Sequence, residues 1–359
     1  MSEPLRARLA RLERLLGAAR RIADPADALG RRARAALGAA GLLSPEGVEL
    51  AIERCLEANP TRGELRALCD AVPSARRAHV LLSANVLTGA HRAVAVALAA
   101  SAHVSVRPSR REPVLAELLW EATGELFHLT DELAPAAGDH VWAYGREETL
   151  HELRENLPPG TFLHAHGPGI GVAVLQPRDD GRDIPSAARA LAEDVVPFDQ
   201  RGCLSPRLAL VAGNRAAAEA FARELGAALA AAEKRVPRGR LEREEAADVT
   251  RYRDALTYAL RVSPAGQGWV SLDVEGKLLL VPPVGRNVHV LRVDALEPAL
   301  TELAPAITAI GLAGPSAVQE CVARIVPRAR LSALGRMQSP PLDGPVDRRA
   351  PREGELVES

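Results

Sequence analysis

Cys203 is the residue whose type and setting most directly indicate chemistry. Gly202 precedes it, Pro206 follows three residues later, and the apolar run 208–211 comes next, so we expect the thiol in a turn at the mouth of a strand. A thiolate presented there is a nucleophile, and its attack on a carbonyl would give acyl transfer or aldehyde redox chemistry. The alternative is that Cys203 is a small buried hydrophobic residue, the commoner role of a lone cysteine.

The remaining cysteines do not extend this chemistry. The chain has four, at Cys55, Cys69, Cys203 and Cys321, and none forms a CxxC pair, so no metal site is expected. Cys55 and Cys69 lie in segments with a helical pattern and are expected in the core. Reduced thiols and the absence of a signal-peptide pattern at the basic N-terminus predict a cytoplasmic protein.

The composition excludes several classes of partner. Among 359 residues, 45 Lys and Arg nearly balance 46 Asp and Glu, and the formal net charge is −1, so general binding to nucleic acid or to a membrane surface is not expected. Aromatic residues make up 3%, which argues against platforms that stack on bases. No run of 18 apolar residues is present, so no membrane span is predicted.

The N-terminal 75 residues are predicted to be helical. Leucines recur at helical spacing with arginines between them, at Leu5, Leu9, Leu12, Leu15 and Leu16. The prolines after Asp24 and Ser44 are typical of helix starts. The pattern favours a docking or oligomerisation helix.

Strand and helix patterns alternate from residue 76 onward. Strands are predicted at 78–82, 103–107, 140–144 and from 161, and helices at 90–100, 112–125 and 147–155. This alternation predicts a parallel, doubly wound sheet. Because ligands of such sheets bind at the carboxyl ends of the strands, the predicted site consists of the loops at 83–89, 107–111, 145–146 and 165–171.

A second α/β unit is expected after about residue 195. Its predicted elements are a helix at 216–234 and strands at 208–212, 269–274, 277–281, 289–293 and 307–312, with a charged, less regular stretch at 235–268. The predicted organisation is a helical segment at 1–75, a cofactor-binding α/β domain at 76–195, a catalytic domain at 196–325, a return segment at 326–349 and a disordered tail at 350–359.

The run Gly167-Pro168-Gly169-Ile170-Gly171 is a weak match to a dinucleotide fingerprint. It lacks the G-x-G-x-x-G spacing and precedes an apolar strand instead of a helix. A nucleotide, if bound, is therefore not held in the common Rossmann manner.

An ordered set of short motifs resembles a known family. The motifs are Ser83–Asn85, Val106–Ser109, Tyr144–Gly145, Gly167–Leu175, Gly202–Pro206 and Gly335–Pro345. Their order resembles the aldehyde dehydrogenase superfamily and, more closely, its acyl-CoA reductase branch, the fatty-acid reductases of the bacterial luminescence type. The resemblance covers about residues 75–349. It implies an α/β, aldehyde-dehydrogenase-like fold of two doubly wound domains with a helical N-terminus.

The resemblance also implies roles for individual residues. Cys203 would attack the acyl carbonyl to give an enzyme-bound thioester, and the Cys203 backbone N–H and the Asn85 side chain would stabilise the oxyanion. The alternative for Asn85 is a turn-forming residue whose side chain is satisfied locally. Reduction by a nicotinamide cofactor would then release an aldehyde.

The cofactor residues implied by the resemblance are Arg107, Pro108, Ser109 and Gly145. Arg107 lies where the superfamily usually has lysine, near the adenosine ribose, and a guanidinium suits a 2′-phosphate. This favours NADPH, with NADH as the alternative. The neighbouring arginines at 110 and 111 add positive charge or form a solvated helix start, and Gly145 would let the backbone approach the cofactor.

One departure from the superfamily pattern bears on the reaction. Aldehyde-oxidising members carry a glutamate base in the segment corresponding to 164–171, whereas this chain has His164-Ala165-His166-Gly167. Without a base to activate water, reduction is favoured over hydrolysis to a free acid. His166 would be a proton donor or a thiol activator, or alternatively a histidine satisfied by backbone groups, and His164 is expected to be structural.

Four functions are compatible with these sequence features. The leading prediction is an acyl-CoA (or acyl-carrier) reductase that forms an aldehyde, and the others are an acyl phosphate reductase, a cysteine-dependent acyltransferase or thioesterase without redox chemistry, and a non-catalytic scaffold. The resemblance implies a homo-oligomer, since the superfamily usually forms dimers or tetramers.

Overall fold

The computed structural model describes residues 3–258, 260–349 and 354–357, and the chain divides into two units. Unit 1 is built from residues of the ranges 1–40, 51–168 and 341–359, and unit 2 from 41–50 and 169–340. The expected boundary at 195 differs from this division because strand β6 (Ile170–Leu175) pairs with strands of unit 2 on both sides.

The N-terminal helices form part of unit 1. They are α1 (Leu5–Ala23), α2 (Ala28–Ala40), the π-helical turn Ala51–Cys55 and α4 (Arg62–Ala71). α1 buries Leu12, Leu15 and Leu16 inside the unit, and its arginines cap neighbouring helices, with Arg11 donating to the Leu98 carbonyl at 2.9 Å. α1 is therefore an internal helix of unit 1 and not the docking or oligomerisation helix that the sequence predicts, because α5 and α6 cover its leucine face.

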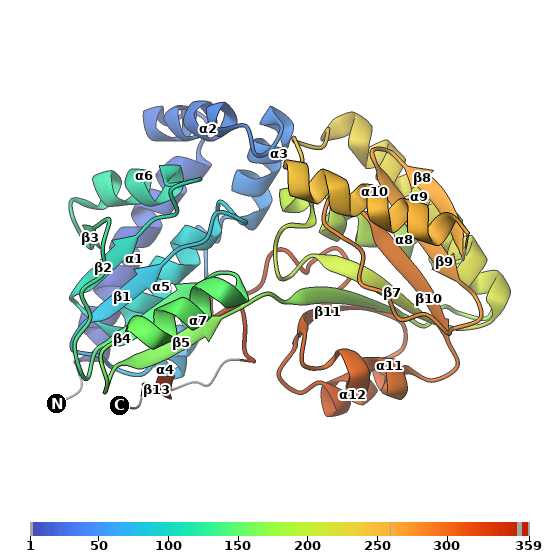
Figure 1. Ribbon diagram of the computed structural model, residues 1–359. Coiled ribbons are helices and arrows are strands. Elements are labelled where there is room, and N and C mark those ends of the chain that lie inside the picture. Colours follow the sequence, from blue (N-terminus) through green and yellow to red (C-terminus); the bar gives the residue numbers. More distant parts are fainter. Residues whose placement is uncertain (1–2, 259, 350–353, 358–359) are drawn as a thin grey trace. The chain divides into compact units, whose positions relative to one another are not determined.

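Unit 1 contains a six-stranded sheet with the order β13-β5-β4-β1-β2-β3 (Figure 1). The strands are β1 (Ala78–Leu81), β2 (Val104–Arg107), β3 (His128–Leu129), β4 (His140–Tyr144), β5 (Phe162–His166) and β13 (Glu355–Leu356). The connecting helices are α5 (Gly89–Ala100), α6 (Val114–Thr123) and α7 (Glu147–Asn156). All pairings are parallel except β13 with β5. α5 packs on β1 and β2, whereas α7 covers Val141 and Leu163 through Leu150.

Unit 2 contains a seven-stranded sheet with the order β12-β11-β6-β7-β10-β9-β8. The strands besides β6 are β7 (Pro206–Ala212), β8 (Arg261–Ala265), β9 (Gly268–Asp273), β10 (Val288–Val293), β11 (Ile307–Ala313) and β12 (Arg330–Ala333). The helices are α3 (Pro45–Leu50), α8 (Ile184–Val195), α9 (Arg215–Arg235), α10 (Arg243–Thr257), α11 (Leu296–Leu303) and α12 (Ser316–Ile325). β8 runs antiparallel to β9 and the other pairings are parallel.

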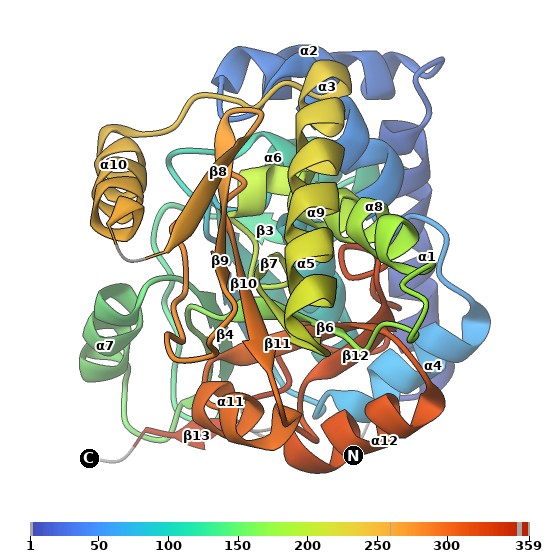
Figure 2. The same cartoon turned by 90° about the vertical axis from the view of Figure 1, so that its right-hand side faces the viewer.

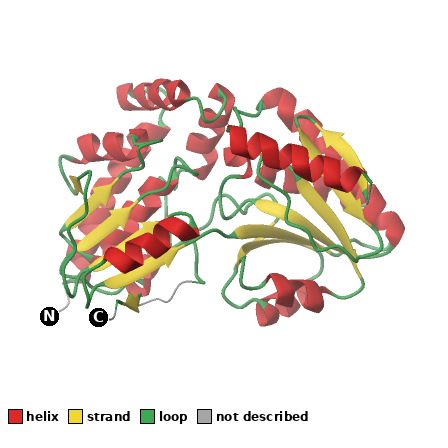
Figure 3. Ribbon diagram, in the orientation of Figure 1, coloured by secondary structure: helices red, strands yellow, loops and turns green. Residues whose placement is uncertain are grey.

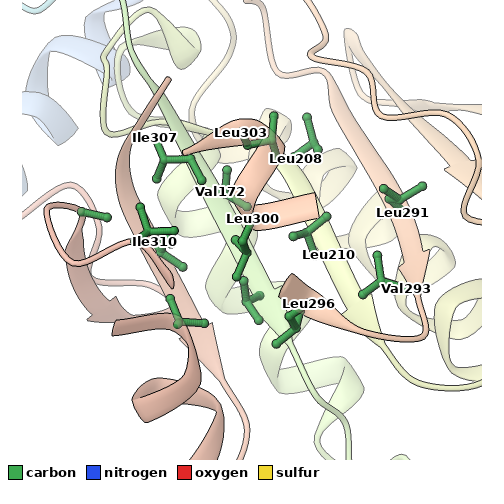
Figure 4. Close-up of a cluster of buried hydrophobic side chains, with 14 of the residues drawn as sticks. Val172, Leu208, Leu210, Leu291, Val293, Leu296, Leu300, Leu303, Ile307 and Ile310 are labelled. Atoms are coloured by element: carbon green, nitrogen blue, oxygen red, sulfur yellow. The ribbon is translucent and has the colours of Figure 1, made fainter. Parts of the chain in front are cut away.

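The sheet of unit 2 is covered on both faces. α8 and α9 lie over one face (Figure 2), and the other face packs on α11 and α12. The core on that second face alternates along the strands, so that Leu208 and Leu210 of β7 meet Leu300 of α11 (Figure 4). Both units thus have the doubly wound α/β organisation that the sequence predicts.

The predicted strand at 277–281 is wrong, and a loop follows β9 there (Figure 3). The Asp273 carboxylate accepts hydrogen bonds from four successive backbone N–H groups, those of residues 275–278, at 2.7–3.0 Å. These donors are consumed by one side chain and are not available for strand pairing. The same hydrogen bonds lower the pKa of Asp273 against the opposing effect of burial.

The charged stretch 235–268 is more regular than the sequence predicts, because it contains α10 and β8. α10 begins with a capping box between Glu242 and Glu245. At the end of the chain, Glu355 and Leu356 form β13, which corrects the expectation of disorder for those two residues, whereas 350–353 and 358–359 lie outside the described residues. Within the described ranges, no helix has both the length and the apolar character needed to cross a membrane.

Candidate active site

Cys203 lies in a turn immediately before β7, and its side chain is half-buried. The Ser205 N–H donates to the Gly202 carbonyl at 3.0 Å and closes the turn around the thiol. All four cysteines are reduced. Cys55 and Cys69 are buried core residues, and burial raises the pKa of Cys69. The buried-hydrophobe alternative thus describes those two residues and does not describe Cys203.

Gly171 allows the Cys203 turn to pack closely against β6. Its N–H donates to the Ser205 carbonyl at 3.0 Å. A Cβ at this position would lie 2.7 Å from the Ser205 carbonyl carbon and closer still to the Leu204 carbonyl oxygen. Gly171, the last glycine of the weak dinucleotide fingerprint, therefore permits a close backbone contact with the Cys203 turn.

The left-handed turn before Cys203 was not anticipated from the sequence. Phe198, Asp199 and Gln200 all have positive φ, and their side chains are buried. Burial raises the pKa of Asp199, against the charges of Arg286 and Arg201. In the sequence, Asp199 and Gln200 follow the apolar run 195–198 and precede Arg201, and this pattern gives no sign of a left-handed backbone.

The sheet of unit 1 has a point where the strand order reverses, between β1 and β4. From β1 the chain proceeds outward to β2 and β3, and it then returns to the other side of β1 with β4 and β5. In open α/β sheets a ligand binds at the carboxyl ends of the strands beside this point. The loops that follow β1 and β4 carry Asn85 and Gly145.

Asn85 has an exposed side chain in the bend after β1. Its amide makes no hydrogen bond to any residue in the described part of the chain. The local side-chain hydrogen bond of a satisfied turn residue is therefore not seen among the described residues, and the exposed amide faces solvent.

The Arg107-Pro108-Ser109 segment ends β2 at the same edge of the sheet. Arg107 is half-buried, and its guanidinium has no ion-pair partner within the described ranges. Glu112, a residue that the sequence reasoning missed, is buried three residues after Ser109, and burial raises its pKa to about 7. Its carboxylate accepts from the Leu115 N–H at 3.4 Å, at the start of α6.

Gly145 directly follows β4, and its N–H donates to the His166 carbonyl at 3.3 Å. A Cβ there would meet the Thr149 side chain at 3.5 Å, an ordinary van der Waals contact. The packing of the chain itself therefore does not require glycine at this position.

His166 ends β5 and is buried, with its ring stacked on Tyr144 at 4.8 Å between centroids. Neither ring nitrogen has a hydrogen-bond partner among the residues described, so the backbone-satisfied alternative does not hold. Burial lowers the pKa of His166 to about 4, and the imidazole is neutral at pH 7. His164, by contrast, stacks on Trp142 at 4.4 Å and lies 2.9 Å from a His140 nitrogen, as expected for a structural residue.

The predicted site residues thus fall into two groups. Asn85, Arg107, Gly145 and His166 share the carboxyl edge of the sheet in unit 1. Cys203 belongs to unit 2, at the amino-terminal end of β7. No cluster of three metal-binding side chains occurs among the described residues.

A family model matches most of the chain. The model of the acyl-CoA reductase (LuxC) family matches residues 62–341, more than half of the chain. No curated protein matches the sequence.

Solved structures share the fold at low sequence identity. An oxidoreductase from Marinobacter aquaeolei has 14% identity and a TM-score of 0.70 over 99% of this chain and 84% of that chain. An NAD-dependent benzaldehyde dehydrogenase from Corynebacterium glutamicum has 17% identity and a TM-score of 0.64 over 90% and 83%. An aldehyde dehydrogenase from Mycobacterium tuberculosis, complexed with NAD+, has 13% identity and a TM-score of 0.65 over 92% and 78%. The predicted aldehyde-dehydrogenase-like fold is confirmed.

Proposed function

Because the chain belongs to the acyl-CoA reductase (LuxC) family, we propose that it reduces an acyl thioester to an aldehyde with NADPH, through an acyl group held on Cys203. The family and the fold support the coarser statement, an oxidoreductase that acts on acyl or aldehyde groups. We further propose a fatty acyl-CoA or acyl-carrier substrate, a homo-oligomer and a cytoplasmic location.

The single observation that carries the proposal is the setting of Cys203. Its thiol is partly exposed in a closed turn, whereas Cys55 and Cys69 are buried in helices. Gly171 lets β6 pack closely against the backbone of this turn at Leu204 and Ser205.

The first step is the attack of the Cys203 thiolate on the acyl carbonyl carbon. A carbon–sulfur bond forms to Cys203, the bond to the CoA sulfur breaks, and CoA leaves as the thiol after taking up a proton. The negative oxygen formed on the way needs donors, and we assign this role to the Cys203 N–H and the Asn85 amide. Asn85 has its amide available because the described residues do not bind it.

Unit 1 has features that fit a nicotinamide cofactor. The strand order reverses at β1 and β4, and Gly145 follows β4 without a packing reason of its own. Arg107, Pro108 and Ser109 would hold the adenosine end, and the Arg107 guanidinium, which has no ion-pair partner among the described residues, suits a 2′-phosphate. When bound, the reduced cofactor would supply a hydride to the acyl carbon, after which the carbon–sulfur bond to Cys203 would break, releasing the aldehyde and returning the Cys203 thiolate.

His166 is proposed to exchange a proton during the reaction. Its neutral ring at pH 7 has an acceptor nitrogen and a donor N–H with no competing partner among the described residues. Because the ring is neutral at pH 7, it has a nitrogen that can accept a proton and holds no imidazolium proton to donate.

The experiment that tests the proposal measures NADPH oxidation with a panel of acyl-CoAs and traps the aldehyde. Cys203→Ala is expected to abolish turnover and the acyl adduct seen by mass spectrometry while NADPH still binds. Cys321→Ala is the matched control, because Cys321 is also a half-buried thiol in unit 2. Undiminished turnover in Cys203→Ala would remove the nucleophile assignment, and an acyl adduct without NADPH oxidation would favour an acyltransferase or thioesterase.

A further inference from the structure

The segment before Cys203 has a backbone conformation that ordinary side chains avoid. Phe198, Asp199 and Gln200 have φ values of 56°, 50° and 66°, three consecutive residues in the left-handed region and none of them glycine. Cβ crowding disfavours this region for L-residues. Such a run persists only where the surroundings enforce it, and those conformations concentrate at functional sites.

The Asp199 side chain is one of the groups that enforce the turn. Its carboxylate lies 2.8 Å from Nη2 of Arg286, and both side chains are almost completely buried, with exposed fractions of 1% and 2%. The carboxylate also accepts from the Gly239 N–H at 3.0 Å, and the Asp199 carbonyl accepts from the Gly285 N–H at 3.0 Å. Arg286 is held in turn by Glu233 at 2.8 Å.

The Gln200 side chain fixes the two strand starts that flank the turn. Its Nε2 donates to the carbonyls of Pro206 and Asn287, each at 2.8 Å, and its Oε1 accepts from the Asn287 N–H at 2.7 Å. Pro206 begins β7, and Asn287 immediately precedes β10. The loop that carries Cys203 is therefore anchored at Gln200 and at Pro206.

We propose that Asp199 and Gln200 are positioning residues, whose buried side chains lock the left-handed turn and so set the direction of the Cys203 thiol. This inference rests on the proposed function of Cys203 as the nucleophile. Neither residue needs to touch the substrate, because each acts through the backbone that leads to the thiol. A role in stability alone would leave the reactivity of Cys203 unchanged in variants that remain folded.

The test compares Gln200→Ala and Asp199→Asn with Leu300→Ala. Leu300 is fully buried in unit 2, in the hydrophobic core between the sheet and α11. Residues 198–200 are not part of that core cluster. Each variant is assayed for kcat and KM with an acyl-CoA, and for the rate of Cys203 alkylation by iodoacetamide from pH 6 to 10. Circular dichroism at the assay temperature confirms folding.

Both turn variants are expected to lose at least tenfold in kcat, with KM within threefold of the parent value, and to show a displaced pH profile of alkylation. Leu300→Ala should melt earlier and keep kcat within twofold and the parent profile. Folded turn variants with the parent kcat and profile would overturn the inference. If Gln200→Ala does not fold, Asp199→Asn, which keeps the side-chain volume and an acceptor oxygen, decides the question.

Failure of the proposed function has a different signature. In that case Cys203→Ala would turn over acyl-CoA as fast as the parent enzyme, whatever the turn variants do. Failure of the positioning inference leaves Cys203→Ala inactive and the folded turn variants fully active.

Discussion

Three of the side chains proposed for the reaction share one property at the residue scale, which is the lack of a hydrogen-bond partner among the described residues. The Asn85 amide, the Arg107 guanidinium and the His166 ring make no side-chain hydrogen bond to the described residues. Buried or half-buried polar groups normally have such partners, and the half-buried Arg107 and the buried His166 do not, whereas Asn85 is exposed. All three lie at one edge of one sheet, where we propose that a polar ligand binds.

Arg107→Ala is expected to weaken NADPH binding by about ten- to a hundredfold, because a charge-assisted hydrogen bond to phosphate is worth roughly 1.5–3 kcal/mol. NADH lacks the 2′-phosphate, so its affinity should change by less than threefold. Fluorescence titration with each cofactor measures both values, and Arg6→Ala, an exposed arginine on α1, is the control. An equal loss for the two cofactors would contradict the assignment of Arg107 to the 2′-phosphate.

His166→Phe is expected to keep the stack on Tyr144 and to lower kcat by about a hundredfold, a common size for the loss of a proton-transfer group. KM for the acyl-CoA should stay within threefold. Because the pKa of His166 is about 4, its protonation should not limit kcat/KM in the parent enzyme between pH 6 and 8. Steady-state kinetics across that range tests both statements, and an unchanged kcat would show that His166 is structural.

At the element scale, the sequence predicted most strands and helices but not the places where a side chain replaces backbone pairing. The alternation of apolar runs gave β1, β2, β4 and β5 within a few residues. It failed where the Asp273 carboxylate binds four backbone N–H groups, since a run of leucine and valine gives no sign of that competition. The left-handed turn at 198–200 was missed for a similar reason, because distant groups such as Arg286 and Asn287 impose it.

Gly171→Ala tests the contact between β6 and the Cys203 turn. The added methyl group would press on backbone atoms of Leu204 and Ser205, which cannot move without displacing the turn. We expect a loss of about 1–3 kcal/mol in the free energy of unfolding and at least a tenfold fall in kcat. Gly226→Ala in α9 is the matched control, since its Cβ would meet nothing within 4 Å and alanine favours a helix by up to about 1 kcal/mol. Denaturant unfolding and turnover measure the pair, and a fully active Gly171→Ala enzyme would show that the contact is dispensable.

A buried histidine of α5, His91, allows a second test, which concerns the stability of the fold at acid pH. His91 is fully buried without a partner for either ring nitrogen among the described residues, and burial, with a smaller effect from Arg92, lowers its pKa to about 3. The unfolded chain takes up this proton near pH 6.5 and the folded chain does not, so the stability is complete above pH 6.5 and falls as the pH drops toward 3.

The expected loss from His91 between pH 7 and 5 is about 2 kcal/mol in the free energy of unfolding. Denaturant unfolding at the two pH values measures it. His91→Leu should reduce the difference between the two values by that amount. His151→Gln, at an exposed histidine on α7, should leave the difference unchanged. A parent-like pH dependence in His91→Leu would mean that His91 is already protonated or hydrated in the folded protein.

At the scale of the whole molecule, the sequence predicted two α/β units but placed their boundary too late. The pattern of strands alone does not say which sheet a strand joins. Only three residues separate β5 from β6, and yet β6 belongs to the second sheet. The predicted site divides in the same way, with the nucleophile in one unit and the remaining residues in the other. The sequence does not predict that the His166 ring lacks a partner among the described residues, because hydrogen bonding between distant segments decides this.

The reverse reaction, in which the enzyme would oxidise an aldehyde, tests whether the lack of a general base in segment 164–171 prevents hydrolysis. Segment 164–171 contains no carboxylate, although Glu147 of α7 lies beside Gly167, where a Cβ would be 2.7 Å from its Oε1. With aldehyde and NADP+ but no CoA, we expect a burst of about one NADPH per Cys203 and then almost no turnover, because water is not activated to release the acyl group. Added CoA should restore steady turnover by accepting the acyl group. Stopped-flow absorbance measures the burst, and steady acid formation without CoA that disappears in Glu147→Gln would show that a carboxylate from α7 takes the place of the missing base.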